Sequence, residues 1–583
     1  LARTTAVEAG PGTGKTRTLV ERILYMIQEQ RISPAEITAV TFTNRAAGEM
    51  EKRIHSRLPG KRGLKRMKIG TFHSICYRML KETGLKAVLL QESEQLEIAE
   101  EVICELGLKQ KPSQLLEEIS RQKTGERVVC EDGADGLEQA CRRYQERLEE
   151  LNGMDYDDIL LKAVKALEEG KMDEKPFRYL LVDEFQDVSS LQYRLIRLMN
   201  RRGRQLFVIG DPDQSIYGFR GSDSRIFERL SRDEPELCRI RLEENYRSSG
   251  HIVHAARELI RHNPGPERGL WTRKEAGTPL RLVSAASEMS EAIFVAKEIN
   301  RMVGGIDMLD AQEGFGPSEE KKTRSFGDIA VIYRTHRQGE LLERCLCQEG
   351  IPYIVAGREE FLQADSVRGS LSFFSCLAGE ESQLTRPLCR KLLWKDREPE
   401  DGEWEQLTAE FLPLYQKQKP GKFLEAWVRR MGFQEDGPME KFCSMAPFYR
   451  TMKEMAEAVR YGGESDLKRC GQKTYASDAV TLTTIHGAKG LEFPAVILFG
   501  ARKGLIPLET KRGETDEEEE RRLFFVGVTR AMEELVITSS KEPSVFLAEL
   551  PKEDRLSEQT GRREKKGQEH QMSLFELDPS FGK

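Results

Sequence analysis

The sequence predicts an α/β protein with two parallel-sheet cores, each interrupted by a mainly helical insertion. Two observations carry this prediction. Short apolar, β-rich segments recur in two series, and helical patterns separate their members. Strands that are apolar on both sides are typical of a parallel sheet covered by helices on both faces. At 583 residues the chain is also too long for one hydrophobic core and suggests roughly four domains.

One series of expected strands precedes residue 250 and the other follows it. The first comprises residues 4–7, 37–42, 67–72, 179–184 and 206–211. The second comprises residues 280–283, 329–334, 480–485, 495–500 and 535–538. We therefore expect a first core at residues 1–79 and 155–249, and a second core at residues 250–365 and 478–550.

Two charged, helix-compatible segments interrupt these series. Residues 80–154 place apolar side chains on one helix face, namely Leu96, Ala99, Val102, Ile103 and Leu106. Residues 366–477 also have helical patterns, with aromatic residues and methionines but no series of strands. Each segment is expected to form a helical accessory domain. From residue 551 to 583 the composition is polar and charged, which is typical of a disordered tail.

The composition excludes several classes of protein. No apolar run approaches the ~20 residues that span a bilayer, so we expect a cytoplasmic protein with no membrane contact. The 11 cysteines form no Cys-x-x-Cys pair, which argues against a metal cluster. The 91 Lys and Arg residues against 97 Asp and Glu residues give a net charge of −6. Any surface that binds nucleic acid must therefore be local.

A phosphate-binding loop is predicted at the end of the first strand. It has the sequence Ala9-Gly10-Pro11-Gly12-Thr13-Gly14-Lys15-Thr16, and a helical pattern begins at Arg17. Glycines let several backbone N–H groups point at one phosphate, and the N-terminus of a helix adds its dipole. Lys15 would reach the β- and γ-phosphates, and Thr16 would bind Mg²⁺. An ordinary glycine-rich turn is the alternative interpretation.

Two carboxylates complete this predicted site. The apolar strand at residues 179–184 ends in Asp183 and Glu184. Asp183 would hold Mg²⁺ through water, and Glu184 would accept a proton from the attacking water. Acidic residues at strand ends are common, but together with the phosphate loop they predict that the first core binds and hydrolyses a nucleoside triphosphate.

Eight motifs in sequence order resemble those of superfamily 1 DNA helicases of the UvrD/Rep/PcrA family. They are GPGTGKT (10–16), TFTNRAAGEM (41–50), GTFHS (70–74), VDEFQD (182–187), GDPDQSIYGFRG (210–221), ENYRSS (244–249), IHGAKGLEF (485–493) and FFVGVTRA (524–531). This resemblance covers nearly the whole chain. It implies two RecA-like P-loop cores with inserted accessory domains, and an ATP- and Mg²⁺-dependent 3′→5′ DNA helicase or single-stranded DNA translocase. It also implies a role in bacterial DNA repair or replication restart, in the cytoplasm and at the nucleoid.

The resemblance assigns roles at the nucleotide. Residues Ala9 to Arg17 would surround the phosphates, and Gln214 would contact the γ-phosphate and the attacking water. Tyr246 would stack on the adenine, and Glu492 would contact the nucleotide from the second core. Arg247 and Arg530 would reach the γ-phosphate across the cleft between the cores. For each arginine, an interdomain ion pair is the alternative.

A track for single-stranded DNA is implied across both cores. The matching positions are Phe42, Phe72, His73, Tyr217, Phe219, Arg220 and His486. Aromatic side chains stack on bases of any sequence and contribute roughly 1–3 kcal/mol per base. For Phe42 and Phe72, a place in the sheet core is an equally good interpretation. Tyr217 and Phe219 flank a glycine in a polar loop, which favours binding.

The sequence also departs from the family pattern. The family's adenine-contacting motif has no counterpart because the sequence begins at Leu1, so we expect an N-terminally truncated chain or weaker adenine selectivity. Phe219 replaces the usual Trp, and Phe525 and Gly527 replace Tyr and Ala. The second insertion is short and lacks a Gly-Ile-Gly signature that contacts duplex DNA, which makes translocation a firmer expectation than strand separation.

The C-terminal tail contains a short motif of its own. Gln571, Leu574 and Phe575 resemble the peptide by which bacterial repair proteins bind the sliding clamp, although a chance string is the alternative. The expected partners are single-stranded DNA, 3′-tailed duplex DNA and this clamp. Two other functions stay open: the motor subunit of a helicase–nuclease complex, and a clamp-tethered ATPase that displaces proteins without processive unwinding.

Overall fold

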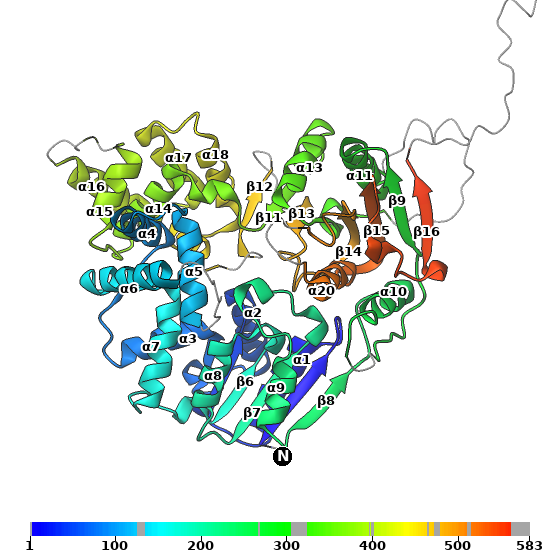
Figure 1. The fold of residues 1–583 in the computed structure, drawn as a ribbon, viewed down its shortest axis with the longest axis horizontal. Coiled ribbons are helices and arrows are strands. Elements are labelled where there is room, and N and C mark those ends of the chain that lie inside the picture. Colours follow the sequence, from blue (N-terminus) through cyan, green and yellow to red (C-terminus); the bar gives the residue numbers. More distant parts are fainter. Residues whose placement is uncertain are drawn as a thin grey trace, which may run out of the picture.

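The computed structural model describes residues 3–560 except 125–133, 266–268, 305–322, 396, 398–401, 463–465, 472–477 and 510–514. For residues 134, 135, 220 and 461 it describes the backbone only. The first core lies at the bottom of Figure 1, the second core at the upper right, and the two accessory domains at the upper left.

The first core is a six-stranded sheet in which every pair of neighbours is parallel. The strand order is β3-β2-β6-β7-β1-β8. Its strands are β1 (Thr4–Ala9), β2 (Ile37–Thr41), β3 (Lys68–Thr71), β6 (Tyr179–Val182), β7 (Gln205–Gly210) and β8 (Cys238–Leu242). Its helices are α1 (Lys15–Gln28), α2 (Asn44–Arg57), α3 (Phe72–Glu82), α7 (Tyr156–Glu168), α8 (Ser190–Met199) and α9 (Ile226–Asp233).

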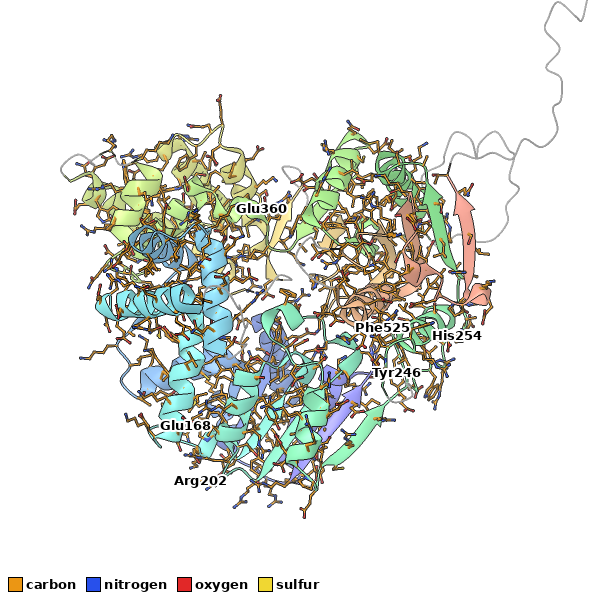
Figure 2. All side chains as sticks on the ribbon, viewed as in Figure 1. Glu168, Arg202, Tyr246, His254, Glu360 and Phe525 are labelled. Carbon is orange, nitrogen blue, oxygen red and sulfur yellow. The ribbon has the colours of Figure 1, made fainter. Side chains whose placement is uncertain are left out.

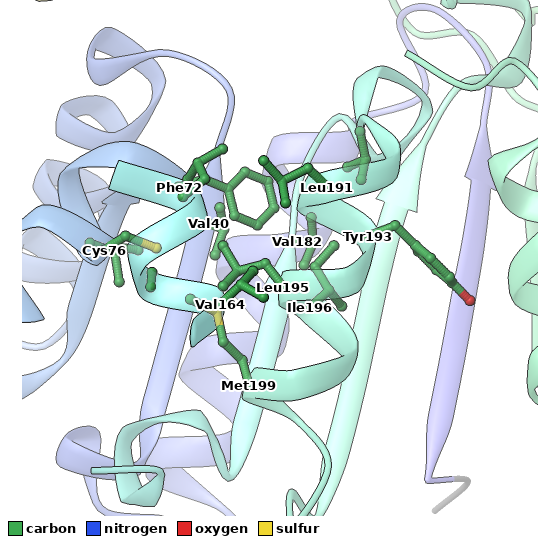
Figure 3. Close-up of a cluster of buried hydrophobic side chains, with 14 of the residues drawn as sticks. Val40, Phe72, Cys76, Val164, Val182, Leu191, Tyr193, Leu195, Ile196 and Met199 are labelled. Atoms are coloured by element: carbon green, nitrogen blue, oxygen red, sulfur yellow. The ribbon is translucent and has the colours of Figure 1, made fainter. Parts of the chain in front are cut away.

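The apolar strands of the first core are buried on both faces. Successive side chains of a strand point to opposite sides, so Ala39 and Leu181 join the cluster under α1 and α2. Val40 and Val182 join the opposite cluster, under α3, α7 and α8 (Figure 3). This double burial is the physical reason why the strands read as continuous apolar runs.

The second core is an eight-stranded sheet with the order β12-β11-β13-β10-β14-β15-β9-β16. Only the β11–β12 pair is antiparallel among the described strands of this sheet. The strands are β9 (Leu280–Ala285), β10 (Ile329–Tyr333), β11 (Tyr353–Ala356), β12 (Lys468–Cys470), β13 (Val480–Thr484), β14 (Phe493–Phe499), β15 (Ala531–Ser540) and β16 (Arg555–Gln559). The helices on it are α10 (Gly250–Ile260), α11 (Glu288–Met302), α13 (His336–Gln348) and α20 (Glu517–Val528).

The C-terminal strand corrects one expectation. A tail was expected from residue 551, but β16 pairs in parallel with β9 and extends the second sheet by one edge strand. Before it, Asp554 is buried and faces His251 and His254 of α10, whose Nδ1 atoms lie 2.8 and 2.5 Å from its carboxylate oxygens. The segment up to residue 560 therefore belongs to the second core.

The first accessory domain consists of α4 (Glu92–Leu106), α5 (Pro112–Thr124) and α6 (Ala134–Glu150). A two-stranded parallel sheet, β4 (Val88–Leu89) with β5 (Gly153–Met154), joins it to the core. On α4, Ala99 and Val102 are fully buried, and Ile103 and Leu106 pack against the same cluster. Four of the five residues of the expected apolar face thus belong to the core of this domain, whereas Leu96 is half-buried outside that cluster.

The second accessory domain is helical and has an aromatic core. Its helices are α14 (Asp365–Leu377), α15 (Thr385–Leu393), α16 (Glu403–Lys417), α17 (Pro420–Met431), α18 (Gly437–Cys443) and α19 (Met452–Tyr461). Phe373 stacks on Trp427 at 4.9 Å between ring centroids, and Trp404 meets Phe373 edge-on at 5.3 Å. Burial of these large rings stabilises a small domain effectively.

The two accessory domains contact each other along α4, α14 and α15, and we call this contact the accessory interface. Gln91 Nε2 donates a hydrogen bond to Ser375 Oγ at 2.7 Å, and the Oγ atoms of Ser93 and Ser372 lie 3.4 Å apart. The buried Glu94 accepts a hydrogen bond from Thr385 at 3.2 Å. The accessory domains therefore stand side by side (Figure 1).

The α/β fold class with one large sheet in each core is confirmed, and all ten expected strands are present. The strands that the sequence pattern missed are the short or polar ones, such as β8, β12 and β16. Among the described residues, no helix combines the length and the apolar character that a bilayer-spanning segment needs.

Candidate functional site

The loop between β1 and α1 has the geometry of a phosphate cradle. Gly12 and Gly14 adopt φ angles of 68° and 87°, which residues with a side chain rarely adopt. A Cβ atom on Gly12 would lie 2.7 Å from Arg247 Cβ and from Asn245 Nδ2. Thr13 Oγ1 donates a hydrogen bond to the Gly10 carbonyl at 2.8 Å and closes the loop. The loop leads directly into the N-terminus of α1, where an anion is favoured.

Lys15 lies between the loop and a buried acid. Its Nζ atom is 3.4 Å from the Ala9 carbonyl oxygen and 3.9 Å from Asp211 Oδ2. Asp183 directly follows β6 and Asp211 directly follows the neighbouring strand β7, so the parallel pairing brings both carboxylates to one sheet edge. Thr16 follows Lys15 in the first turn of α1.

Both acids are held away from water. Burial raises the pKa of Asp183 to about 7 and that of Asp211 to about 6, although the charge of Lys15 opposes both shifts. Buried carboxylates beside a phosphate cradle are the oxygen ligands that Mg²⁺ prefers. The donor set therefore fits a magnesium-bound nucleoside triphosphate, with Thr16 and Asp183 as the residues that would hold the metal.

Glu184 has a different environment from its neighbour. Burial disfavours its charge, but Lys15 and Lys489 outweigh this effect and its pKa lies below the ordinary value. Its backbone is left-handed, with φ of 47°, and Gln186 Nε2 donates a hydrogen bond to its Oε2 at 2.7 Å. Non-glycine residues in this conformation cluster at functional sites. Glu184 is therefore ionised and available to accept a proton.

Arg530 of the second core reaches Gln214 of the first. Gln214 Nε2 donates to Asp211 Oδ2 at 2.7 Å, while Arg530 Nη2 donates to Gln214 Oε1 at 3.4 Å. Arg530 also donates to the carbonyls of Val526 and Leu491. Burial, with the charge of Arg247, lowers the pKa of Arg530 to about 9. This guanidinium is positioned by backbone carbonyls and faces the carboxylates of the first core.

The segment at residues 244–249 joins the phosphate loop to the second core. Asn245 Nδ2 donates to the Pro11 carbonyl at 2.8 Å, and the Tyr246 N–H donates to the Gly12 carbonyl at 2.9 Å. The Tyr246 ring is 63% exposed where the two cores meet (Figure 2). Arg247 Nε donates to Glu492 Oε2 at 2.6 Å, so these two predicted nucleotide contacts are paired with each other.

Lys489 is a contact between the cores that was not predicted individually. Its Nζ atom lies 2.5 Å from Asp187 Oδ2 and 2.7 Å from the carbonyl oxygen of Gln214. Burial raises the pKa of Asp187 to about 7 against the opposing charge of Lys489. Asp187 lies within the family-like motif at 182–187, and Lys489 lies within the motif at 485–493. These motifs could therefore have identified both residues from the sequence.

Four aromatic side chains form a cluster beside this site, and we call them the aromatic cluster: Phe42, Tyr217, Phe219 and His486. The rings of Phe42 and Tyr217 stack at 5.4 Å, and Phe219 meets His486 edge-on at 5.5 Å. Phe219 is 52% exposed. The first core supplies three of these rings and the second core supplies His486. The sequence prediction of these four positions thus converges on one place in the structure.

The aromatic cluster lines a cavity of about 860 Å³, which we call the track cavity. Thr16, Asp183 and Glu184 open onto it from the phosphate site. Arg121 of the first accessory domain and Arg460 of the second also line it. One space therefore adjoins the nucleotide site, the aromatic cluster and all four domains.

Two other predicted DNA contacts, Phe72 and His73, also line the track cavity. Phe72 is only 5% exposed and packs among Val40, Val182 and Leu191 (Figure 3). This packing favours the alternative interpretation of Phe72 as a core residue, and a DNA contact at this position stays a prediction. His73 lines the track cavity and stacks on Tyr156 at 3.9 Å; burial lowers its pKa to about 3, so its ring is neutral.

Some predicted positions lie outside the described residues. They are the side chain of Arg220 and the tail residues Gln571, Leu574 and Phe575. Within the part of the chain that the structure describes, no cluster of three or more His, Cys, Asp or Glu side chains could hold a metal ion.

The fold and the site define a P-loop protein whose nucleotide site is shared between two cores. Residues 1–235 match the UvrD/REP helicase N-terminal domain, and residues 240–395 and 436–542 match the UvrD-like helicase C-terminal domain. The chain therefore belongs to the UvrD/REP helicase family, which confirms the resemblance seen in the eight motifs.

Two relatives illustrate this membership. The chain is 28% identical to the ATP-dependent DNA helicase PcrA of Staphylococcus epidermidis, over 96% of this chain and 85% of that protein. It is 27% identical to the protein of the same name from Staphylococcus aureus strain Mu50, over 96% of this chain and 86% of that protein.

Proposed function

We propose that this protein is an ATP- and Mg²⁺-dependent DNA helicase or single-stranded DNA translocase that moves 3′→5′ and acts in DNA repair or replication restart. One observation carries the proposal: Arg530 and Lys489 of the second core contact Gln214 and Asp187 of the first, beside the aromatic cluster. A nucleotide bound at this point would touch both cores. Its hydrolysis would therefore be linked to their separation.

Each residue of the site has a chemical task. Bound Mg²⁺–ATP supplies the phosphoanhydride that is cleaved and a metal that neutralises phosphate charge. Lys15 and the loop N–H groups bind and orient the phosphates, and Glu184 accepts a proton from the attacking water. Gln214 orients that water, and Arg530 stabilises the charge that develops when the cores close.

The coupling to DNA follows from short chain connections. Gln214 is three residues from Tyr217, and Lys489 is three residues from His486. Lys489 Nζ also lies 4.8 Å from the centre of the Tyr217 ring. A shift of the second core relative to the first would therefore change the spacing of the rings on which bases stack. Alternating closure and opening would move the strand.

The substrate and the cellular setting rest on the relatives and the motifs. Bacterial PcrA proteins are named ATP-dependent DNA helicases, which supports DNA as the substrate and the bacterial cytoplasm as the location. The 3′→5′ polarity, the repair or restart pathway and the clamp contact through Gln571, Leu574 and Phe575 are extensions from the family resemblance.

ATP hydrolysis and strand displacement test this proposal. With single-stranded DNA present, Lys15→Ala is expected to lower ATP turnover by at least about 10³-fold, because the phosphates lose their main cation. The wild-type protein should unwind a 3′-tailed duplex but not a 5′-tailed one. Lys417→Ala, at an exposed position on α16, is the control and should behave like the wild type. Retained turnover in Lys15→Ala would refute the assignment, and unwinding from 5′ tails would refute the polarity.

A further inference from the structure

We propose that an exposed loop of the first core is a second contact site for the backbone of single-stranded DNA, beyond the aromatic cluster. The site consists of Lys61, Arg62, Lys65 and Arg66, which follow α2, and we call it the basic loop. This inference rests on the proposed function, since it extends the path of the same strand.

The sequence around the basic loop carries many positive charges and no negative charge. Residues 52–81 contain ten Lys and Arg residues and not one Asp or Glu, whereas the average composition would place about five acids there. The whole chain has a net charge of −6. A local positive surface on an otherwise acidic protein attracts phosphates to that surface, while the rest of the protein repels them.

The four cations face solvent and are not neutralised. All four side chains are exposed, and none forms an ion pair with a described residue. The flanking cations differ, because Arg57 pairs with Glu21 at 3.0 Å and Lys68 pairs with Glu82 at 3.4 Å. The charges at the tip of the loop are therefore available to a ligand.

The loop presents these charges on a fixed backbone. Leu64 and Met67 are 6% and 7% exposed and join the apolar cluster under α1 and α2. The one-turn helix at Leu64–Arg66 begins after Gly63, whose φ is 87°. Buried apolar residues thus alternate along the loop with exposed cations. Because the backbone is already fixed, binding of a ligand costs less conformational entropy than it would for a flexible chain.

Helix α2 connects the basic loop to the track cavity. Its first residues, Asn44 and Arg45, line that cavity, and the helix then runs for 14 residues, about 21 Å, to the loop (Figure 1). Arg45 and Lys52 lie two turns apart on its exposed side. A strand that leaves the aromatic cluster along α2 would meet Arg45, Lys52 and the basic loop in turn. The charge and the path together favour single-stranded DNA over a protein or a lipid surface.

The salt dependence of DNA binding tests the inference. The variant Lys61→Gln/Arg62→Gln/Lys65→Gln/Arg66→Gln is compared with Lys417→Gln/Lys419→Gln/Lys422→Gln/Lys441→Gln, which removes as many exposed charges from the second accessory domain. Binding of thymidine oligomers of about 8 and about 30 nucleotides is measured at several salt concentrations. For the long oligomer, the slope of log K against log salt should become shallower by about 2.8 in the basic-loop variant. Neither variant should change binding of the short oligomer.

The outcomes separate this inference from the proposed function. If the basic-loop variant and the control bind the long oligomer with equal slopes, the inference is wrong and the helicase assignment stands. An equal loss on the short oligomer also overturns it, because the loop would then not lie beyond the cluster. If the wild-type protein binds neither oligomer, the proposed function itself fails. Thermal unfolding of each variant verifies that it is folded.

Discussion

Asp183 and Asp211 meet at one sheet edge with little water around them, and their charges therefore cost free energy in the nucleotide-free protein. Lys15 compensates only in part, because its Nζ atom is 3.9 Å from Asp211. A divalent cation held by Thr16 and Asp183 would offset part of the remaining cost. At the scale of single residues, the site is thus prepared for a metal-bound anion.

Asp183→Asn is expected to stabilise the nucleotide-free protein at pH 8. The pKa of Asp183 is about 7 in the folded chain, against about 3.9 in an unfolded chain. The folded state therefore holds the proton more tightly, and the free energy of unfolding falls as the pH rises from about 4 to about 7. The neutral amide avoids this loss, which is at most about 4 kcal/mol.

Denaturant unfolding without Mg²⁺, at pH 5 and pH 8, measures this effect. The advantage of Asp183→Asn should be larger at pH 8. The same variant should lose Mg²⁺-dependent ATP hydrolysis, because a carboxylate ligand is gone. An advantage that is equal at both pH values would show that the Asp183 carboxyl is not the titrating group.

Arg530→Lys is expected to lower kcat for ATP by about 10³-fold or more while nucleotide affinity changes only a few-fold. An ammonium cannot keep the hydrogen bonds to the Val526 and Leu491 carbonyls and also reach Gln214. Single-turnover hydrolysis and the binding of a fluorescent, non-hydrolysable ATP analogue separate the two effects. Arg522→Lys, on the same helix as Val526, is a control with a single backbone contact to the first core. Unchanged kcat in Arg530→Lys would remove its catalytic role.

Residue-level predictions are most specific where a motif fixes the backbone. The phosphate loop follows β1, Asp183 follows β6 and Gln214 lies shortly after β7, and the parallel pairing of these strands brings all three to one sheet edge. For Phe72 the sequence left two interpretations open, because an aromatic residue at the start of a helix suits a base and a core equally well. The structure favours the core, where Phe72 is buried among Val40, Val182 and Leu191.

At the scale of elements, β16 depends on charged contacts more than on apolar burial. Arg281 of β9 donates two hydrogen bonds to the Glu558 carboxylate of β16, and the Asp554 carboxylate contacts the rings of His251 and His254. Leu556 is 54% exposed. An edge strand held in this way gives no apolar pattern, which explains why the sequence reads there as a tail.

Asp554→Ala is expected to release this strand from α10 and β9. Both histidines would lose their common carboxylate, at a cost of about 1–3 kcal/mol. Hydrogen exchange of the amides at residues 552–559 should become at least about tenfold faster, while exchange in β1 should not change. Glu553→Ala, at the exposed neighbouring position, is the matched control. Identical exchange in the two variants would mean that the histidine contacts do not hold the strand.

At the scale of the whole molecule, the four domains contact one another in a closed cycle. The first core continues into the first accessory domain, which meets the second accessory domain at the accessory interface. β12 joins the second accessory domain to the second core, and Lys489 joins that core to the first. All four domains line the track cavity, so the described residues form a ring around it.

A disulfide across the accessory interface tests this cycle. In Ser93→Cys/Ser372→Cys, the two sulfur atoms replace oxygens that lie 3.4 Å apart, so oxidation should join them. The oxidised protein should respond to linear single-stranded DNA in ATP hydrolysis but not to circular DNA, which has no end to enter. Reduction of the same sample is the control. Equal stimulation by both DNA forms in the oxidised protein would show that the cycle is open elsewhere.

The sequence predicted the two cores and their insertions, because each has its own apolar periodicity. It did not predict how the insertions meet. Contacts such as Gln91 with Ser375 and Glu94 with Thr385 join polar residues about 290 positions apart. Such polar pairs have no period, and only the assembled fold brings them together.

The cations of the nucleotide site already have anionic partners inside the protein. Lys15 faces Asp211, Lys489 faces Asp187, and Arg247 faces Glu492. A bound triphosphate would place its oxygens beside these cations, in competition with the carboxylates that now pair with them, while Thr16 and Asp183 would hold the metal. The net affinity is a difference between two strong sets of attractions, so modest rearrangements of the cleft can switch the protein between capture and release of the nucleotide.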